Sequence, residues 1–245
     1  MKRRDKFEIL KNENLADSVY EMVLKGDTSG LLPGMFVNIE IEPFYLRRPI
    51  SVCDAKGGRL TIVYKEAGKG TKKLSRMCAE SVLDIVLPLG NGFTIEKEQK
   101  KILLIGGGAG LPPLYFLCKQ LKDSGKSVDV AMGFNTAGEI FYEENFKKTA
   151  DSVLVMTADG SYGKKGFVTD APYEGKSYDF FYACGPVPML KAVCEKTQIK
   201  GELSLEARMG CGYGACMGCA VRTRHGMKRV CHEGPVFERG EIIWE

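Results

Sequence analysis

Histidine and tryptophan are scarce in this sequence, which has two histidines and one tryptophan among 245 residues. His225 and His232 are isolated, and we expect them to be structural or exposed. The sequence therefore offers no Ser-His-Asp triad and no histidine–metal constellation. We predict chemistry that needs no catalytic side chain acting as a general base.

Long apolar runs and long basic runs are also missing. The first residues, Met1-Lys2-Arg3-Arg4-Asp5, are charged and contain no apolar signal segment, and no later run is long enough to cross a membrane. The net charge is +4, and basic pairs are scattered with no sustained block. We therefore expect a cytoplasmic protein with neither a membrane nor a nucleic acid as its main partner.

Cysteine, in contrast, is plentiful, and four of the nine cysteines carry the most specific motif in the chain. Cys211, Cys216, Cys219 and Cys231 follow the spacing C-x4-C-x2-C-x11-C, which matches the plant-type ligand run for a 2Fe–2S cluster. Four thiolates also suit a structural zinc ion, although zinc ribbons usually pair two C-x2-C knuckles and only one is present here. The spacing favours a 2Fe–2S cluster and hence a protein that transfers electrons.

The hydrophobic pattern divides the chain into three segments. Residues 1–98 contain short alternating runs separated by turn residues, which predict an antiparallel β-barrel. Residues 99–200 alternate buried strands with helices, which predicts a doubly wound α/β domain with a parallel sheet. Residues 201–245 are rich in glycine and cysteine, and we expect a bound cluster to organise this small segment.

Two glycine loops in the α/β segment each follow a predicted buried strand and precede a helix. The first is Gly106-Gly107-Gly108-Ala109-Gly110 and the second is Ala183-Cys184-Gly185-Pro186. Both would lie at strand carboxyl ends, where open α/β sheets bind ligands, although a tight turn would also explain the first loop. Its spacing is not the G-x-G-x-x-G fingerprint, so a Rossmann dehydrogenase is a poor match.

Two basic stretches in the barrel segment are candidate phosphate sites. Arg47-Arg48-Pro49-Ile50-Ser51 places a guanidinium near a serine hydroxyl, and Gly68-Lys69-Gly70-Thr71 precedes a predicted short helix at 72–77. Either stretch taken alone could equally be a solvated basic turn.

Taken together, these motifs resemble the ferredoxin–NADP reductase family, in which a barrel holds FAD and an α/β domain holds a nicotinamide dinucleotide. The resemblance implies that Arg48, Pro49, Ile50 and Ser51 bind FAD, with Arg48 and Ser51 on its phosphates. It places Gly70 and Thr71 on the other side of these phosphates and Tyr64 close to the flavin. Gly107, Gly108 and Gly110 would hold the nicotinamide dinucleotide, and Cys184 and Gly185 would face its nicotinamide.

The appended cluster segment narrows the resemblance. The run from Ser204 to Cys219 and the run Cys231-His232-Glu233-Gly234-Pro235 look like the electron-transfer subunits of type B dihydroorotate dehydrogenases. That family implies an FMN-bearing catalytic partner, in a heterotetramer of two subunits each, and electron flow through the cluster and FAD to NAD in pyrimidine biosynthesis. Simple reductases end in an aromatic residue against the flavin, but Trp244 follows the cluster segment and is not assigned that role.

The charged residues of the α/β segment favour NAD over NADP as the bound dinucleotide. Residues 133–139 carry no Arg or Lys for a 2′-phosphate, and Glu139 and Asp159 would repel one. Two other functions remain open. One is the small subunit of an NAD(P)H-dependent ferredoxin or sulfide oxidoreductase. The other is a non-catalytic scaffold module stabilised by zinc.

Overall fold

The computed structural model describes residues 2–171 and 177–244. The N-terminal part is a closed antiparallel barrel with the strand order β1-β2-β5-β4-β3-β6. Successive side chains of a barrel strand point alternately into the barrel and out of it, and those that point inward are apolar. In β3 (Phe36–Ile39), Val37 and Ile39 belong to the barrel core, whereas Phe36 packs in a different core outside the barrel. The remaining barrel elements are β1 (Arg3–Ala16), β2 (Val19–Lys25), β4 (Arg48–Lys56), β5 (Arg59–Lys65), the short helix α1 (Lys69–Leu74) and β6 (Val82–Leu89).

The second part is a seven-stranded sheet in the order β10-β9-β8-β7-β11-β12-β15. Its strands are parallel except β15, which pairs antiparallel with β12. The strands are β7 (Lys101–Gly107), β8 (Ser127–Phe134), β9 (Ser152–Thr157), β10 (Lys164–Lys165), β11 (Phe180–Cys184), β12 (Gly201–Ser204) and β15 (Val236–Glu238). The helices and 3-10 turns are η1 (Gly108–Gly110), α2 (Leu111–Asp123), η2 (Ala137–Glu139), α3 (Glu143–Thr149), η3 (Val168–Asp170) and α4 (Val187–Lys196).

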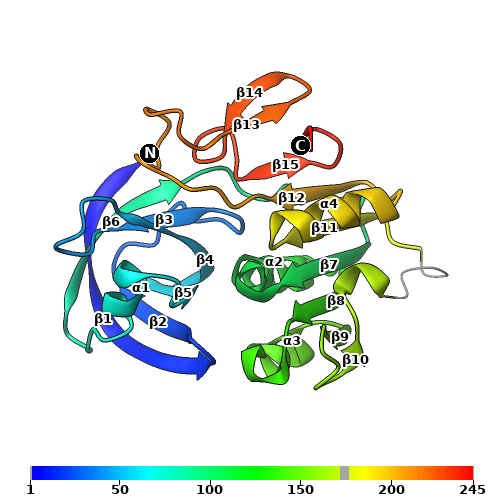
Figure 1. Cartoon of the computed structure of the whole chain (residues 1–245), viewed down its shortest axis with the longest axis horizontal. Helices are drawn as coiled ribbons and strands as arrows, with labels where there is room; N and C mark the ends of the chain where they lie inside the picture. The colour runs from blue at the N-terminus through cyan, green and yellow to red at the C-terminus, as the bar shows by residue number, and fades with distance from the viewer. Residues whose placement is uncertain (1, 172–176, 245) are drawn as a thin grey trace.

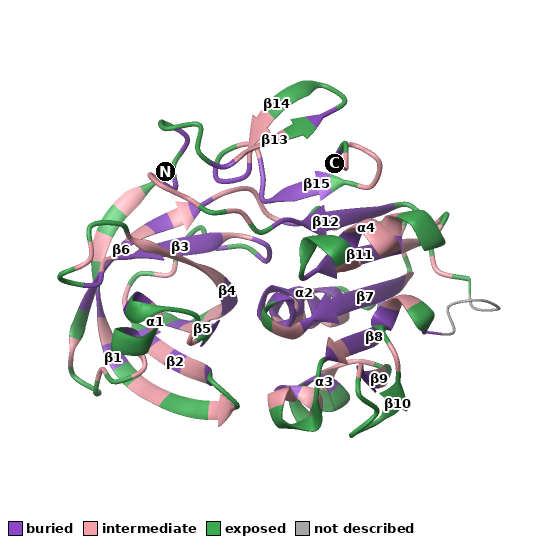
Figure 2. Cartoon of the chain, viewed as in Figure 1, coloured by how far each residue is buried: buried purple, intermediate pink, exposed green. Residues whose placement is uncertain are grey.

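Both faces of this sheet are covered, as a doubly wound fold requires. Helices α2 and α3 lie between the sheet and the barrel, and α4 lies on the opposite face (Figure 1). The central strands β7, β11 and β12 are buried nearly throughout (Figure 2). This explains the continuous apolar runs of β7 and β11, and the predicted fold class is confirmed.

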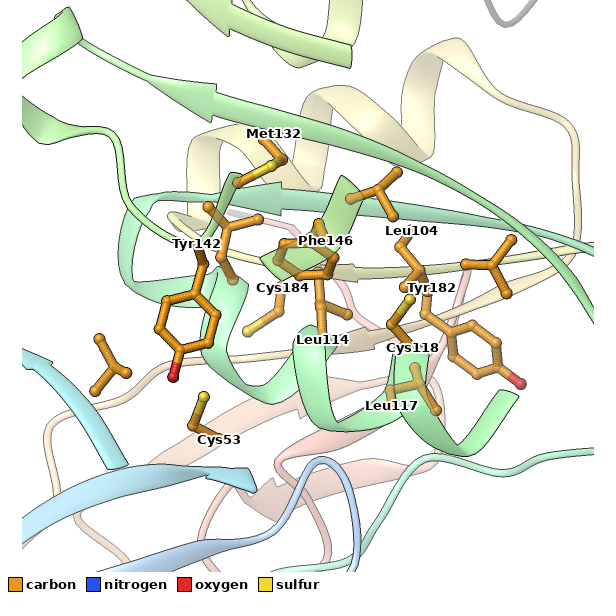
Figure 3. Close-up of a cluster of buried hydrophobic side chains, with 14 of the residues drawn as sticks. Cys53, Leu104, Leu114, Leu117, Cys118, Met132, Tyr142, Phe146, Tyr182 and Cys184 are labelled. Atoms are coloured by element: carbon orange, nitrogen blue, oxygen red, sulfur yellow. The ribbon is translucent and has the colours of Figure 1, made fainter. Parts of the chain in front are cut away.

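The barrel and the sheet share one core. Figure 3 shows Tyr142, at the start of α3, pointing toward Cys53 of β4. The Tyr142 hydroxyl also donates a hydrogen bond to Glu21 of β2. The pKa of Tyr142 is raised well above its usual range, mainly because the hydroxyl is buried and also because Cys53 and Glu21 lie beside it. This buried polar contact fixes the barrel against the α/β part.

The C-terminal residues sit across one end of both parts (Figure 1). The hairpin β13 (Ala220–Thr223) and β14 (Gly226–Arg229) forms its own small sheet. Strand β15 then returns to the large sheet beside β12. No helix in residues 2–171 or 177–244 has the length and apolar character needed to cross a bilayer.

Candidate functional site

A cavity of about 590 Å³ lies between the barrel and the carboxyl ends of the parallel strands. The barrel contributes Tyr64 and its neighbours on β5, and the sheet contributes Gly107 and Gly108 after β7. The ends of β8 and β11 complete the walls with Phe134 and Pro186. Three residues that the sequence singled out, Tyr64, Gly107 and Gly108, therefore line one cavity. The other predicted nucleotide-binding residues lie outside its lining.

The two predicted glycine loops pack directly on each other. A Cβ on Gly110 would lie 2.1 Å from the Cys184 carbonyl oxygen, and one on Gly185 would lie 3.1 Å from the Gly107 nitrogen. Gly185 also has a φ of +156°, which L side chains rarely adopt. Glycine at these positions lets the ends of β7 and β11 meet and form a narrow floor beside the cavity.

A carboxylate and a thiol stand near this floor. Cys184 is buried, and burial followed by the nearby Glu206 raises the pKa of its thiol to about 12. Glu206 lines the cavity just after β12, and the surrounding protein desolvates its carboxyl and raises its pKa. Sequence reasoning missed Glu206. The available signal was its position, a carboxylate just past the end of a buried strand.

Glu139 also lines the cavity, and its carboxylate is held in place from both sides. It accepts hydrogen bonds from the Asn135 backbone N–H at 3.0 Å and from the Asn135 amide at 2.9 Å. Lys65 of the barrel reaches it across the cavity mouth at 2.9 Å. Burial opposes ionisation, but these donors outweigh it and lower the pKa of Glu139. Asp159, the other predicted acid, does not line the cavity and accepts instead from Ser161.

The two adjacent arginines of the barrel have different surroundings. Arg47 is bound by Glu40 at 2.6 Å and by Asp84 at 2.7 Å, so its charge is already neutralised. Arg48 lies over the Phe44 ring at 5.2 Å and against Gly70, where a Cβ would come within 2.4 Å of the Arg48 Nε. The structure thus brings together Arg48 and Gly70, from the two basic stretches that the sequence proposed as phosphate sites.

The other predicted barrel residues have local roles in the structure. The Thr71 hydroxyl accepts from the N–H groups of Ala67 and Gly68 and so caps the start of α1. Tyr64 stacks on Tyr20 at 5.9 Å and donates to the Asn12 side chain at 2.8 Å. Pro49, Ile50 and Ser51 continue β4 beyond Arg48 and are half-buried.

The four predicted cluster ligands form two pairs. The Cys211 N–H points at the Cys216 sulfur at 3.5 Å, and the Cys231 N–H points at the Cys219 sulfur at 3.4 Å. In the described part of the chain, no group of three or more Cys, His, Asp or Glu side chains is arranged to hold a single metal ion. Two pairs of thiols fit a cluster of two irons, each of which takes two protein ligands.

Backbone N–H groups favour the thiolate form of Cys211. Its sulfur accepts from Ala215 at 3.2 Å and from Cys216 at 3.4 Å. Burial opposes ionisation, but the N–H groups outweigh it and lower the pKa of Cys211 to about 6. Cys231 has the opposite environment, and burial followed by Cys219 raises its pKa to about 12. Thiolate ligands surrounded by N–H donors are what an iron–sulfur cluster requires.

Family models match two parts of the chain. Residues 104–195 match an oxidoreductase NAD-binding domain, and residues 206–243 match the iron–sulfur cluster binding domain of dihydroorotate dehydrogenase B. These two ranges contain the glycine loops and all four paired cysteines.

Solved structures share the fold. An NADH-dependent reduced ferredoxin–NADP oxidoreductase superimposes with a TM-score of 0.90 at 33% identity, covering 97% of this chain and 90% of that chain. An Amycolatopsis cytochrome P450 reductase superimposes with a TM-score of 0.71 at 20% identity, covering 80% of this chain and 65% of that one. At that lower identity the likeness concerns the fold alone.

Curated relatives match along the whole length. The electron transfer subunit of dihydroorotate dehydrogenase B (NAD(+)) from Shouchella clausii is 38% identical, covering 99% of both chains. The corresponding subunit from a Geobacillus species is 40% identical, covering 99% of this chain and 100% of the relative. The chain therefore belongs to the electron transfer subunits of dihydroorotate dehydrogenase B, a family of oxidoreductases.

Proposed function

We propose that this chain passes electrons from a dihydroorotate-oxidising partner subunit to NAD+, through a 2Fe–2S cluster and FAD, in pyrimidine biosynthesis. The observation that carries the proposal is the cavity shared by Tyr64 of the barrel and Gly107 and Gly108 of the sheet. Such a cavity lets a flavin on the barrel meet a nicotinamide on the sheet. When bound, FAD would exchange a hydride with NAD and single electrons with the cluster.

The α/β part, for which we propose the range 99–200, would hold NAD. Gly107, Gly108 and Gly110 would let the backbone approach the dinucleotide, and Cys184 and Gly185, which pack against this loop, would face the nicotinamide. The ionised Glu139 at the cavity wall would select NAD by repelling a 2′-phosphate. The residues orient the two reactants, and no side chain is required to take up a proton during hydride transfer.

The barrel, for which we propose the range 1–98, would hold FAD. The Arg48 guanidinium lies beside Gly70 and, unlike Arg47, forms no ion pair with a carboxylate of the described residues, so it would be available to the FAD phosphates. Ser51 and Thr71 would add hydroxyl groups along the same edge. Tyr64 would contact the flavin from the cavity side. Pro49 and Ile50 would support it through the β4 backbone.

The C-terminal part, for which we propose the range 201–245, would hold the cluster on Cys211, Cys216, Cys219 and Cys231. Cys216 is exposed, and so are Tyr213 and Met217, which lie close to it in the sequence, and Met227 on the β13–β14 hairpin. Exposed apolar side chains beside a redox site suit a protein partner. We propose that the FMN-containing catalytic subunit docks there, in a heterotetramer of two subunits each, in the cytoplasm, where thiols stay reduced.

An anaerobic visible spectrum of the purified chain tests the cofactor part of this proposal. A flavin band with iron–sulfur shoulders that bleaches when NADH is added is the expected result. A colourless, zinc-containing protein with no response, after cofactor loss is excluded, would instead favour the scaffold function.

Mixing with candidate partners tests the substrate part. With an FMN-containing dihydroorotate-oxidising subunit, we expect orotate and NADH to form together, while this chain alone forms no orotate. The likeness to the NADH-dependent ferredoxin–NADP oxidoreductase supports one competing function. Rapid ferredoxin reduction without any coupling to dihydroorotate would favour that alternative.

A further inference from the structure

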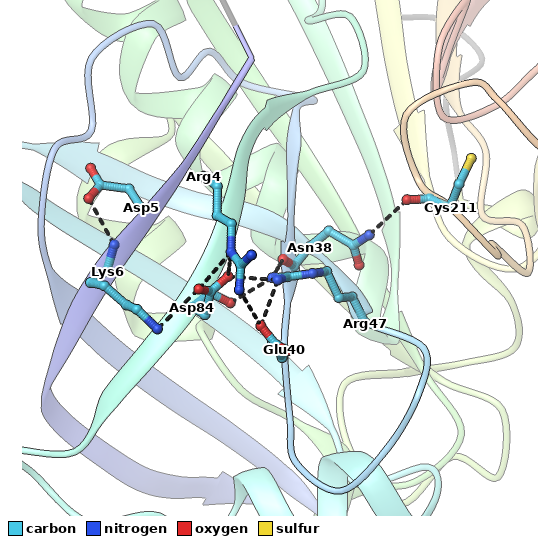
Figure 4. A network of polar contacts seen from close by, with 8 residues as sticks. All are labelled: Arg4, Asp5, Lys6, Asn38, Glu40, Arg47, Asp84 and Cys211. Atoms are coloured by element: carbon cyan, nitrogen blue, oxygen red, sulfur yellow. Dashed lines mark hydrogen bonds and ion pairs between the residues drawn. The ribbon is translucent and has the colours of Figure 1, made fainter.

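Asn38, on strand β3 of the barrel, forms a hydrogen bond to one of the proposed cluster ligands, Cys211. Its side-chain Nδ2 donates a hydrogen bond to the Cys211 carbonyl oxygen at 3.3 Å, across a separation of 173 residues. Figure 4 shows the side chain reaching from β3 to the cluster loop. The neighbouring Gly212 is so close that a Cβ there would lie 2.4 Å from the Asn38 Nδ2. The cluster loop therefore rests directly on this amide.

Stability alone does not account for an asparagine at this position. Asn38 is 2% exposed, and its Oδ1 is buried without a hydrogen-bond partner within the described residues. A buried acceptor without a donor costs free energy, and an apolar side chain of the same shape would avoid that cost. The Asn38 amide does, however, form the hydrogen bond to Cys211, which an apolar side chain could not form.

The strand that carries Asn38 lies beside the proposed flavin site. In the register of β3 and β4, Asn38 is opposite Pro49 and Ile39 is opposite Arg48. Strand β3 therefore lies between the cluster loop and residues 48–51 of β4, which we propose bind FAD. The hydrogen bond between Asn38 and Cys211 spans the remaining gap.

Charged side chains hold the Asn38 backbone in place. Arg47 donates to the Asn38 carbonyl oxygen at 3.4 Å and to the Asp84 carbonyl oxygen on β6 at 2.9 Å. Asp84 is in turn paired with Arg4 at 2.8 Å (Figure 4). The amide therefore projects from a well-braced strand, as a positioning device needs.

We propose that Asn38 is a positioning residue for electron transfer between FAD and the cluster. By holding the Cys211 carbonyl, it fixes the cluster loop at one distance and orientation from the flavin-binding strand. This proposal rests on the proposed function. Outer-shell partners of metal ligands commonly change activity by about 10- to 100-fold when they are replaced.

The test compares Asn38→Leu with the parent in the complete chain loaded with both cofactors. Leucine keeps the branched shape but donates no hydrogen bond. NADH supplies two electrons as a hydride to FAD, after which one passes to the cluster and the other stays on the flavin. Stopped-flow absorption follows both steps, and electron paramagnetic resonance reports the reduced cluster. A parent that NADH does not bleach would refute the proposed function itself, before any comparison with the variant.

We expect flavin reduction to keep its rate while cluster reduction slows about tenfold or more and the resonance spectrum of the cluster changes. Thermal stability should change little, because the variant loses one hydrogen bond and also loses a buried oxygen that has no partner. The matched control is Asn14→Leu, the same substitution at a β1 asparagine whose side-chain amide donates to the Ala16 and Val19 carbonyl oxygens and not to the cluster loop. It should leave the spectrum unchanged. Equal cluster reduction and equal spectra in Asn38→Leu and the parent would overturn the proposal.

Hydrogen exchange gives a second readout that does not depend on the rate of electron transfer. In Asn38→Leu, and in the smaller variant Asn38→Ala, the amides of residues 209–214 should exchange faster than in the parent at matched cluster content. Exchange in the β13–β14 hairpin should stay the same. Unchanged exchange at 209–214 in both variants would contradict the proposal, even if the variants load less cluster.

Discussion

At the scale of single residues, the nucleotide sites depend on where side chains are absent. Gly110 and Gly70 belong to different parts of the fold, yet at both a Cβ would collide with a neighbour that we assign to a cofactor site. At Gly110 the obstacle is the Cys184 backbone, which cannot move freely. At Gly70 it is the Arg48 guanidinium, which can swing away.

This difference predicts separate effects of two alanine substitutions. Gly110→Ala should push the β7 and β11 loops apart, lower the free energy of unfolding by about 1–3 kcal/mol and raise the KM for NADH. Gly70→Ala should cost less stability and instead weaken FAD binding, by about tenfold, because Arg48 is displaced. Thermal denaturation, NADH kinetics and flavin titration measure these effects. Identical effects of both substitutions on NADH and FAD would contradict the assignment of two sites.

Glu139 provides a residue-scale test of cofactor choice. Glu139→Gln keeps the shape but removes the charge that would face a 2′-phosphate, and it frees Lys65 to attract one. The preference for NADH over NADPH should fall by about tenfold, because the repulsion between one carboxylate and a nearby 2′-phosphate is removed. Ratios of kcat/KM for the two cofactors measure it. Asp159→Asn is the control, since Asp159 does not line the cavity, and an unchanged preference in Glu139→Gln would refute the role.

Asp84 predicts a pH dependence of stability. Burial raises its pKa, but hydrogen bonds from Arg4, Arg47 and Lys6 outweigh burial, so the pKa is well below its usual range. The carboxylate therefore stabilises the fold above about pH 4, and this contribution is lost as pH falls toward the lowered pKa.

Asp84→Asn should lower the free energy of unfolding by about 1–3 kcal/mol at neutral pH, a moderate value because two of the three cations are exposed. The difference in the free energy of unfolding between the variant and the parent should become smaller as the pH is lowered from 7 to 3. Urea denaturation across this range measures it, with the exposed Glu13→Gln as control. A difference in the free energy of unfolding that becomes larger at low pH would contradict the lowered pKa of Asp84.

At the scale of elements, the sequence predicts the strands and helices that have strong apolar periodicity and misses those that do not. The run Ile102–Ile105 and the helix around Leu114 are found as β7 and α2. Strand β1 was not predicted, because only Phe7 and Ile9 of its 14 residues are fully buried and its other side chains are largely charged or polar. The sequence leaves open a solvated basic turn at Arg47–Ser51, whereas the structure has Arg48–Ser51 as the start of β4.

Helix α3 shows why element ends are hard to predict. The sequence from about Glu139 to Lys148 predicts one helix, whereas in the structure η2 ends at Glu139 and α3 begins at Glu143. Tyr142 has a φ of +63°, which breaks the helix and lets its hydroxyl reach Glu21 of the barrel. A contact between distant parts of the chain decides this boundary, and local sequence does not contain it.

The C-terminal elements predict how the protein responds to loss of the cluster. The hairpin β13–β14 is hydrogen-bonded within itself and to residues 241–243, whereas β15 is hydrogen-bonded to β12 of the large sheet. Removing iron with a chelator under reducing conditions should speed amide exchange in residues 206–229, with little change in β15 and the barrel. Hydrogen exchange read by mass spectrometry measures this. Uniform protection before and after chelation would show that the cluster does not organise the segment.

At the scale of the whole molecule, the cofactor sites that we propose would lie in series. The cavity joins the barrel to the sheet, and the cluster loop lies on the outer side of the barrel strand next to β4. The cysteine spacing and glycine loops indicated each site, but their relative placement could not be predicted, because it depends on contacts such as Asn38 with Cys211 and Lys65 with Glu139. Residues far apart in sequence make these contacts.

The central claim is that electrons from dihydroorotate reach NAD+ only through this chain's cluster. The most direct test compares the parent with Cys216→Ser, each assembled with the FMN-containing catalytic subunit and given dihydroorotate and NAD+ without oxygen. NADH formation should be lost in the variant, by about 100-fold or more if a ligand is removed. Oxidation of dihydroorotate by an artificial electron acceptor should continue. NADH formation at the parental rate in a variant shown to lack the cluster would contradict the account.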